Sequence, residues 1–192
     1  MKIIKTQVGI IGAGPAGLTL AHWLKKQGIS SVIIENRSRA YIEARVRAGL
    51  LEQNTVDILD SLGLADRLKK EGQEHHGVYL NFDGERIRVP FGELTGGRNI
   101  TIYGQQEVVK DLTDAWFAGG GELFFEATAT KINDFETDHP TIHFEYQGEN
   151  AILECDFVAA CDPLEMTVKA DFTPRGNVHT VVEVKHKKEV IF

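Results

Sequence analysis

The segment Val8-Gly9-Ile10-Ile11-Gly12-Ala13-Gly14-Pro15-Ala16-Gly17 decides the fold of this chain. Its first four residues form a short apolar run without polar alternation, which is typical of a strand that is buried on both faces of a parallel sheet. Gly12, Gly14 and Gly17 have the spacing G-x-G-x-x-G, and a helical pattern of leucines and alanines then continues to Gly28. This order predicts a strand, a tight glycine turn and a helix whose N-terminus can bind a pyrophosphate.

A second apolar run, Val32-Ile33-Ile34, ends in Glu35, which lies 23 positions after Gly12. An acidic residue about 20 positions beyond this motif accepts hydrogen bonds from the adenosine ribose of a bound dinucleotide. We therefore expect an α/β fold with a parallel sheet begun by residues 8–11 and 32–35. The motif alone does not separate FAD from NAD, and a glycine-rich turn without a ligand is the remaining alternative.

The remaining sequence changes its period several times. The basic stretch 36–47 shows no convincing period and is predicted to be a loop. From Gly77 the period becomes two, which predicts a β-hairpin with its turn at Asp83-Gly84. Helices are predicted over 50–62, 65–70 and 105–117, and further strands over 100–103, 123–125, 128–132, 142–146, 152–154 and 157–160. The strands predict a smaller, partly antiparallel β layer beside the parallel sheet.

Composition limits the class of protein. The 192 residues contain 42% hydrophobic and 26% charged residues, as in ordinary globular domains, and the net charge of −7 argues against nucleic acid as a partner. No apolar run approaches the ~20 residues that span a bilayer, and the first residues do not resemble a cleavable signal, so a cytoplasmic protein without a membrane partner is expected. Cys155 and Cys161 lack the spacing of a zinc site and are expected to be reduced structural thiols, with no metal bound.

Two further motifs point to a family. Arg45-x-Arg47-Ala48-Gly49-x-Leu51-Glu52-Gln53 and Tyr103-Gly104-Gln105-x-Glu107-Val108 follow the glycine turn and Glu35. Together these residues resemble the p-hydroxybenzoate hydroxylases, which are FAD-dependent aromatic hydroxylases. The resemblance covers about residues 1–162 and implies a Rossmann-like FAD-binding domain there, truncated relative to a family whose members are roughly twice as long. Residues 163–192 are expected to be an unrelated β tail.

The resemblance also implies roles for single residues. The glycine turn and Glu35 would bind the ADP half of FAD, the segment 45–50 would line the flavin and pyrophosphate, and Gln105 would contact FAD. The implied FAD-binding residues are Gly12, Gly14, Gly17, Glu35, Arg45, Val46, Arg47, Ala48, Gly49, Leu50, Gln105 and Asp162. Implied contacts of the co-substrate NADPH or NADH are Tyr41, Arg45 and Arg47, and the choice between these coenzymes stays open.

The implied activity is hydroxylation of a small phenolic acid, 4-hydroxybenzoate in the family, with a homodimer as a possible assembly. His75 matches a family histidine that ends a proton relay from the substrate phenol, and a surface histidine is the alternative. Asp162 is followed by Pro163 where the family has glycine, and the family's substrate-binding half is absent. We therefore expect little or no hydroxylation by this chain alone. A non-catalytic dinucleotide-binding module, or another FAD- or NAD-dependent oxidoreductase, is the competing reading.

The last thirty residues have a different pattern. Residues 166–184 predict two strands around the turn Pro174-Arg175-Gly176, and they resemble the C-terminal strands of the queuosine-pathway nitrile reductases. The catalytic cysteine and aspartate segments of that family are absent, and a purely structural hairpin is the alternative. A gene fusion, a truncation or an assembly error at Asp162-Pro163 would each explain the pattern.

Overall fold

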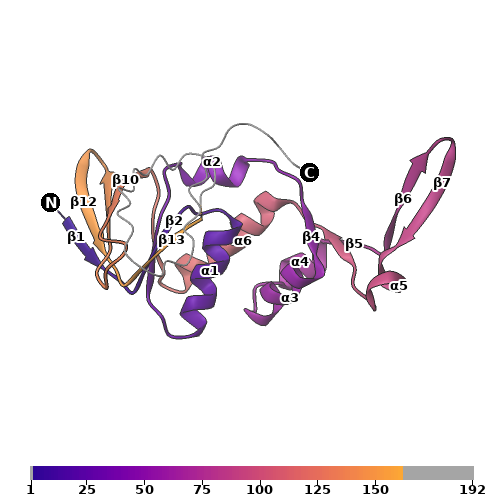
Figure 1. Cartoon of the computed structure of the whole chain (residues 1–192), viewed down its shortest axis with the longest axis horizontal. Helices are drawn as coiled ribbons and strands as arrows, with labels where there is room; N and C mark the ends of the chain where they lie inside the picture. The colour runs from indigo at the N-terminus through magenta and orange to yellow at the C-terminus, as the bar shows by residue number, and fades with distance from the viewer. Residues whose placement is uncertain (1, 162–192) are drawn as a thin grey trace.

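A computed structural model describes residues 2–161 of the chain, and a parallel sheet lies at its centre (Figure 1). The helix α1 (Pro15–Lys26) connects two adjacent parallel strands of this sheet, β2 (Val8–Ile11) and β3 (Ser31–Ile34). The strand–helix–strand unit that the glycine motif predicts is therefore confirmed. The strand order is β13 (Phe157–Ala160), β2, β3 and β9 (Glu122–Phe124).

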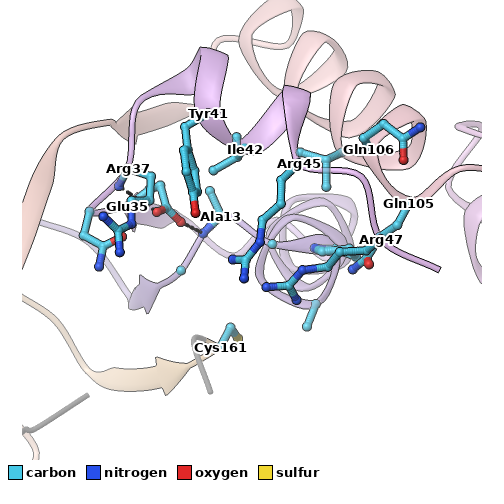
Figure 2. Close-up of a pocket in the computed structure, with 16 residues that line it drawn as sticks. Ala13, Glu35, Arg37, Tyr41, Ile42, Arg45, Arg47, Gln105, Gln106 and Cys161 are labelled. Carbon is cyan, nitrogen blue, oxygen red and sulfur yellow. Dashed lines mark hydrogen bonds between the residues drawn. The ribbon is translucent and has the colours of Figure 1, made fainter. Parts of the chain in front are cut away.

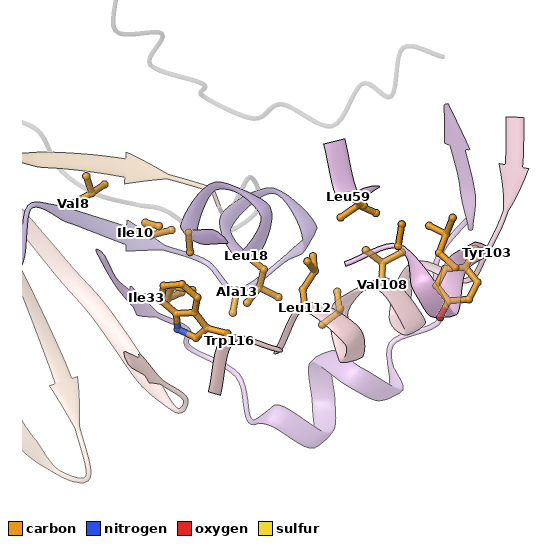
Figure 3. Close-up of a cluster of buried hydrophobic side chains, with 14 residues drawn as sticks. Val8, Ile10, Ala13, Leu18, Ile33, Leu59, Tyr103, Val108, Leu112 and Trp116 are labelled. Atoms are coloured by element: carbon orange, nitrogen blue, oxygen red, sulfur yellow. The ribbon is translucent and has the colours of Figure 1, made fainter. Parts of the chain in front are cut away.

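The two central strands of the parallel sheet, β2 and β3, are buried on both faces. Successive side chains of a strand point to opposite faces, so each strand packs against two different layers. On one face the sheet packs against α1 and α6 (Gln105–Ala118), and the buried cluster on that side includes Ile10, Ile33, Leu18, Leu112 and Trp116 (Figure 3). On the other face Ile11, Val32 and Ile34 pack against Ile142, Phe144 and Leu153 of a second sheet. This double burial explains why β2 and β3 are continuous apolar runs.

The second sheet is largely antiparallel, as the period-two segments predict. Its strands β10 (Ala127–Asn133), β11 (Thr141–Tyr146) and β12 (Glu149–Glu154) form antiparallel neighbours, and β1 (Lys2–Lys5) pairs with β12 in parallel. The expected α/β class, a parallel sheet with a smaller antiparallel layer, is thus confirmed.

A third group of elements lies beyond α6. A small antiparallel sheet has the order β4 (Leu50–Glu52), β8 (Ile100–Ile102), β5 (Gln73–His75), and it is accompanied by α3 (Gln53–Ser61) and α4 (Asp66–Glu71). The predicted hairpin is confirmed as β6 (Gly77–Phe82) and β7 (Glu85–Pro90), which projects from the rest of the molecule next to α5 (Phe91–Thr95) (Figure 1). The strands outside the parallel sheet therefore form three separate sheets within the described residues.

Two local predictions are wrong. The stretch 36–47 contains the helix α2 (Arg39–Ala44), which begins at Ser38 because the Ser38 hydroxyl accepts a hydrogen bond from the Tyr41 N–H at 3.2 Å. The helix predicted over 50–62 begins only at Gln53, because residues 50–52 pair with β8 instead. The predictions for Asp162, Pro163 and the tail fall outside the described residues. None of the helices in residues 2–161 combines the length and apolar character that crossing a bilayer requires.

Candidate functional site

Glycine is required at one position of the turn between β2 and α1 and at one position in the first turn of α1. Gly12 has φ of +103°, a value that side chains disfavour. A Cβ atom on Gly17 would lie 2.0 Å from the carbonyl oxygen of Gly12, so this glycine lets α1 pack tightly on the turn. Gly14 is the N-cap of the helix and forms no side-chain cap, and a Cβ there would meet no atom of residues 2–161 within 4 Å apart from its own chain neighbours. Because Pro15 has no N–H, the uncapped donors of the first turn belong to the two residues that follow it.

Glu35 is held at the end of β3 beside this turn. The N–H of Ala13 donates a hydrogen bond to its Oε2 and the N–H of Arg37 donates one to its Oε1, both at 2.8 Å (Figure 2). The Glu35 side chain is buried, so these two bonds fix its position. Each carboxylate oxygen keeps a second lone pair, which is available to a ribose hydroxyl.

The segments on either side of helix α2 bring three arginines to the same place. Arg37, Arg45 and Arg47 lie around the turn, and the Tyr41 ring is 5.3 Å from the Arg37 guanidinium and 5.9 Å from that of Arg45. In the described part of the chain, neither Arg45 nor Arg47 forms an ion pair. Their positive charge is therefore available to an anionic ligand, and a planar guanidinium suits phosphate oxygens.

The start of α6 forms the other end of the site. Gln105, Gln106 and Val109 face the arginine segment, and Gln106 Oε1 is buried without a hydrogen-bond partner among the described residues. The N–H of Tyr103 donates to the Gly49 carbonyl at 2.7 Å, which joins the end of the arginine segment to the residues before α6.

These elements enclose a pocket of about 550 Å³ (Figure 2). It brings together seven of the residues predicted from sequence, namely Gly12, Gly14, Glu35, Tyr41, Arg45, Arg47 and Gln105. It also contains residues that the sequence reasoning missed, namely Ala13, Pro15, Ala16, Asn36, Arg37, Ile42, Gln106, Val109 and Cys161. Burial raises the pKa of the Cys161 thiol, so this thiol is protonated at neutral pH.

The other predicted residues lie elsewhere. Gly17 is buried beneath the turn, and Val46, Ala48, Gly49 and Leu50 belong to the segment whose arginines reach the pocket without lining it themselves. His75 is an exposed residue of β5 and does not line the pocket. Asp162 lies outside the described residues. Within residues 2–161, no group of three or more His, Cys, Asp or Glu is arranged to hold a metal ion.

The donor set fits a dinucleotide. One pocket contains a carboxylate for a ribose, an uncapped helix N-terminus beside an open glycine, and two arginines that form no ion pair with residues 2–161. A pyrophosphate needs N–H donors and cationic groups, and an adenosine needs an acceptor for its ribose hydroxyls. The fold and the pocket therefore define a dinucleotide-binding protein of the α/β class.

Comparison with known proteins specifies the family. A family model described as "FAD binding domain" matches residues 5–184, and the chain belongs to this family, so its cofactor is FAD. The p-hydroxybenzoate hydroxylase of Acinetobacter baylyi is 41% identical over 184 residues, which is 96% of this chain and 45% of that protein. The chain thus spans less than half the length of this relative. The predicted resemblance to the hydroxylases is confirmed.

The second predicted resemblance is confirmed as well. The NADPH-dependent 7-cyano-7-deazaguanine reductase of Trichormus variabilis is 81% identical over 42 residues, or 22% of this chain and 30% of that protein. Among solved structures, p-nitrophenol 4-monooxygenase from Pseudomonas putida has a TM-score of 0.73 at 23% identity and covers 84% of this chain and 42% of its own. This likeness supports the fold.

Proposed function

We propose that this chain is the FAD-binding part of a flavoprotein monooxygenase of the 4-hydroxybenzoate 3-monooxygenase type. The single observation that carries the proposal is the joint presence of Glu35, the open glycine turn, Arg45 and Arg47 in one pocket, in a chain 41% identical to a p-hydroxybenzoate hydroxylase. The proposed co-substrate is NADPH or NADH, and the proposed substrate is a small phenolic acid such as 4-hydroxybenzoate.

Each end of the pocket has its own task. Glu35 accepts hydrogen bonds from the adenosine ribose, while the turn at Gly14 and the first N–H groups of α1 bind the pyrophosphate. Arg45 and Arg47 neutralise the phosphate charges, and Gln105 contacts the part of FAD beyond the pyrophosphate. FAD supplies the redox chemistry when it is bound, and the protein's residues bind and orient it.

The arginine segment also provides the surface for the second coenzyme. Tyr41, Arg45 and Arg47 are proposed to contact NAD(P)H, because they lie together at the pocket with exposed side chains. His75 is proposed as a proton-relay residue by family resemblance alone, since its position on β5 is outside the pocket. The clustered arginines are already assigned to the cofactor, so they are not available to bind the carboxylate of a phenolic acid. We therefore expect this chain to yield little hydroxylated product.

The test is a titration of the purified chain with FAD, followed by visible spectroscopy of the retained protein. We expect flavin bands, and slow NAD(P)H oxidation without 3,4-dihydroxybenzoate. Tight NAD binding without retained flavin would instead identify a nicotinamide-dependent dehydrogenase. Flavin binding without any NAD(P)H oxidation would identify a dinucleotide-binding module, and robust formation of 3,4-dihydroxybenzoate would contradict the expected inactivity.

A further inference from the structure

An ionic network lies on the side of α6 that faces away from the pocket. Arg67 of α4 donates to three carboxylates, which are Glu71 on its own helix, Asp111 at 2.9 Å and Glu107. Glu107 and Asp111 are four residues apart and so share one face of α6. Arg67 therefore connects α4 to the first turns of the helix that begins with Gln105.

Tyr103 joins this network to the cofactor pocket. Its hydroxyl donates to Asp111 Oδ2 at 2.7 Å, and the Arg67 guanidinium lies 5.8 Å from its ring centroid. The Tyr103 side chain is buried, and its backbone N–H bonds to the Gly49 carbonyl. A Cβ atom on Gly49 would come within 2.6 Å of the Tyr103 carbonyl oxygen, so the two backbones are in close contact.

The two faces of α6 thus have different partners. Gln105 and Val109, also four residues apart, line the pocket, while Glu107 and Asp111 are held by Arg67. A helix whose one face is fixed by several hydrogen bonds cannot rotate to move its other face. The contacts of Arg67 and Tyr103 therefore determine where Gln105 lies relative to the arginine segment that ends at Gly49.

We propose that Arg67 and Tyr103 are positioning residues of the FAD site, which fix Gln105 and the backbone at Gly49 for the flavin-bearing half of the cofactor. This inference rests on the proposed cofactor role of the pocket. Neither residue lines the pocket, so both act through α6 and through the Tyr103–Gly49 contact. The adenosine end, at Glu35 and Gly12, is held by separate contacts from β2 and β3.

The experiment compares FAD with ADP, which contains the adenosine and pyrophosphate but lacks the flavin. The variants are Arg67→Met and Tyr103→Phe, and the matched control is Lys69→Met, which removes an ion pair between α4 and Asp60 of α3 without touching α6. We expect both test variants to weaken FAD binding about tenfold, which corresponds to ~1.4 kcal/mol, and to change the ADP dissociation constant less than about twofold. Lys69→Met should change neither the FAD affinity nor the ADP affinity.

Equal loss of FAD and ADP affinity would overturn the proposal, because it would show that the network only stabilises the domain. Unchanged affinity for both ligands would overturn it as well. Amide hydrogen exchange without ligand gives an independent measurement. Exchange at Tyr103 and Val108, whose N–H groups donate to the carbonyls of Gly49 and Gly104, should accelerate in both test variants and stay unchanged in Lys69→Met, and no acceleration would refute the positioning role. Failure of the unmodified chain to bind FAD would reject the proposed function. The exchange data would still decide whether Arg67 and Tyr103 hold the start of α6 against Gly49.

Discussion

Substitution of the motif glycines separates two roles that the sequence pattern does not distinguish. In the variant Gly17→Ala, the new Cβ atom would lie 2.0 Å from the Gly12 carbonyl oxygen and 3.2 Å from Ile10 Cγ2. The nearest contact is a backbone oxygen within the turn, so relief requires α1 to move by more than about 1 Å. Overpacking of this kind costs ~1–3 kcal/mol.

The variant Gly14→Ala is the matched comparison. Gly14 has φ of −74° and ψ of 178°, which alanine adopts without strain, and within the described residues the added Cβ would meet no atom within 4 Å beyond its chain neighbours. The free energy of unfolding should therefore change by less than about 1 kcal/mol. The added methyl group would occupy space beside the pocket where the pyrophosphate approaches the backbone, so we expect FAD affinity to fall about tenfold.

Urea unfolding without cofactor and a FAD titration by flavin fluorescence measure the two effects separately. A loss of ~2 kcal/mol in Gly17→Ala lowers the urea midpoint by about 1 M when the slope m is near 2 kcal/mol/M. Gly14→Ala should keep the midpoint and lose cofactor affinity. Equal destabilisation of both variants, or unchanged FAD affinity in Gly14→Ala, would refute the assignment of Gly14 to the ligand and Gly17 to helix packing.

Three further predictions follow from single side chains. Arg45→Met should weaken FAD binding and reduce its dependence on salt, while the urea midpoint stays constant because Arg45 has no ion pair within residues 2–161. His22 packs against α6, and its Nε2 forms a hydrogen bond with the Leu112 carbonyl at 2.9 Å. Burial lowers the pKa of His22 below 6.5, so protonation of this side chain favours the unfolded chain. The free energy of unfolding should therefore fall as pH drops below 6.5, and His22→Gln should remove this part of the decrease in urea titrations. FAD should slow alkylation of Cys161 by iodoacetamide, measured by mass spectrometry, and in Gly14→Ala the same protection should require about tenfold more FAD.

The sequence predicts elements best where local pattern and tertiary burial agree. The helix α6 and the β6–β7 hairpin are found within a few residues because their apolar periods match their final environment. The strand β1 gave no clear signal, since it is formed by parallel pairing with β12, about 150 residues away in the chain. The helix α2 has six residues, which is too short for a helical period to emerge from the sequence.

The residues of the pocket also divide into those that a local sequence pattern locates and those that only tertiary packing brings there. Glu35 could be located because a fixed interval after Gly12 places it at the end of the next parallel strand. Gln106 and Cys161 could not, because their place depends on how α6 and β13 pack around the turn. The Arg67–Tyr103 network was also invisible, since its four carboxylate contacts join residues up to 44 positions apart and follow no motif.

The distribution of burial supports the proposal that this chain binds FAD without hydroxylating a substrate. The pocket rests on strands whose two faces are both covered within residues 2–161, by α1 and α6 on one side and by the antiparallel sheet on the other. The hairpin differs, since Leu80 and Ile87 oppose each other on one face and are both at least half exposed. An isolated two-stranded hairpin gains little stability of its own, so an apolar face of this kind is suited to packing against further chain. Within residues 2–161 the nucleotide site is thus built on a covered core, whereas the hairpin beside the strand that carries His75 leaves apolar side chains exposed. This division of the core supports the proposed retention of FAD without hydroxylated product.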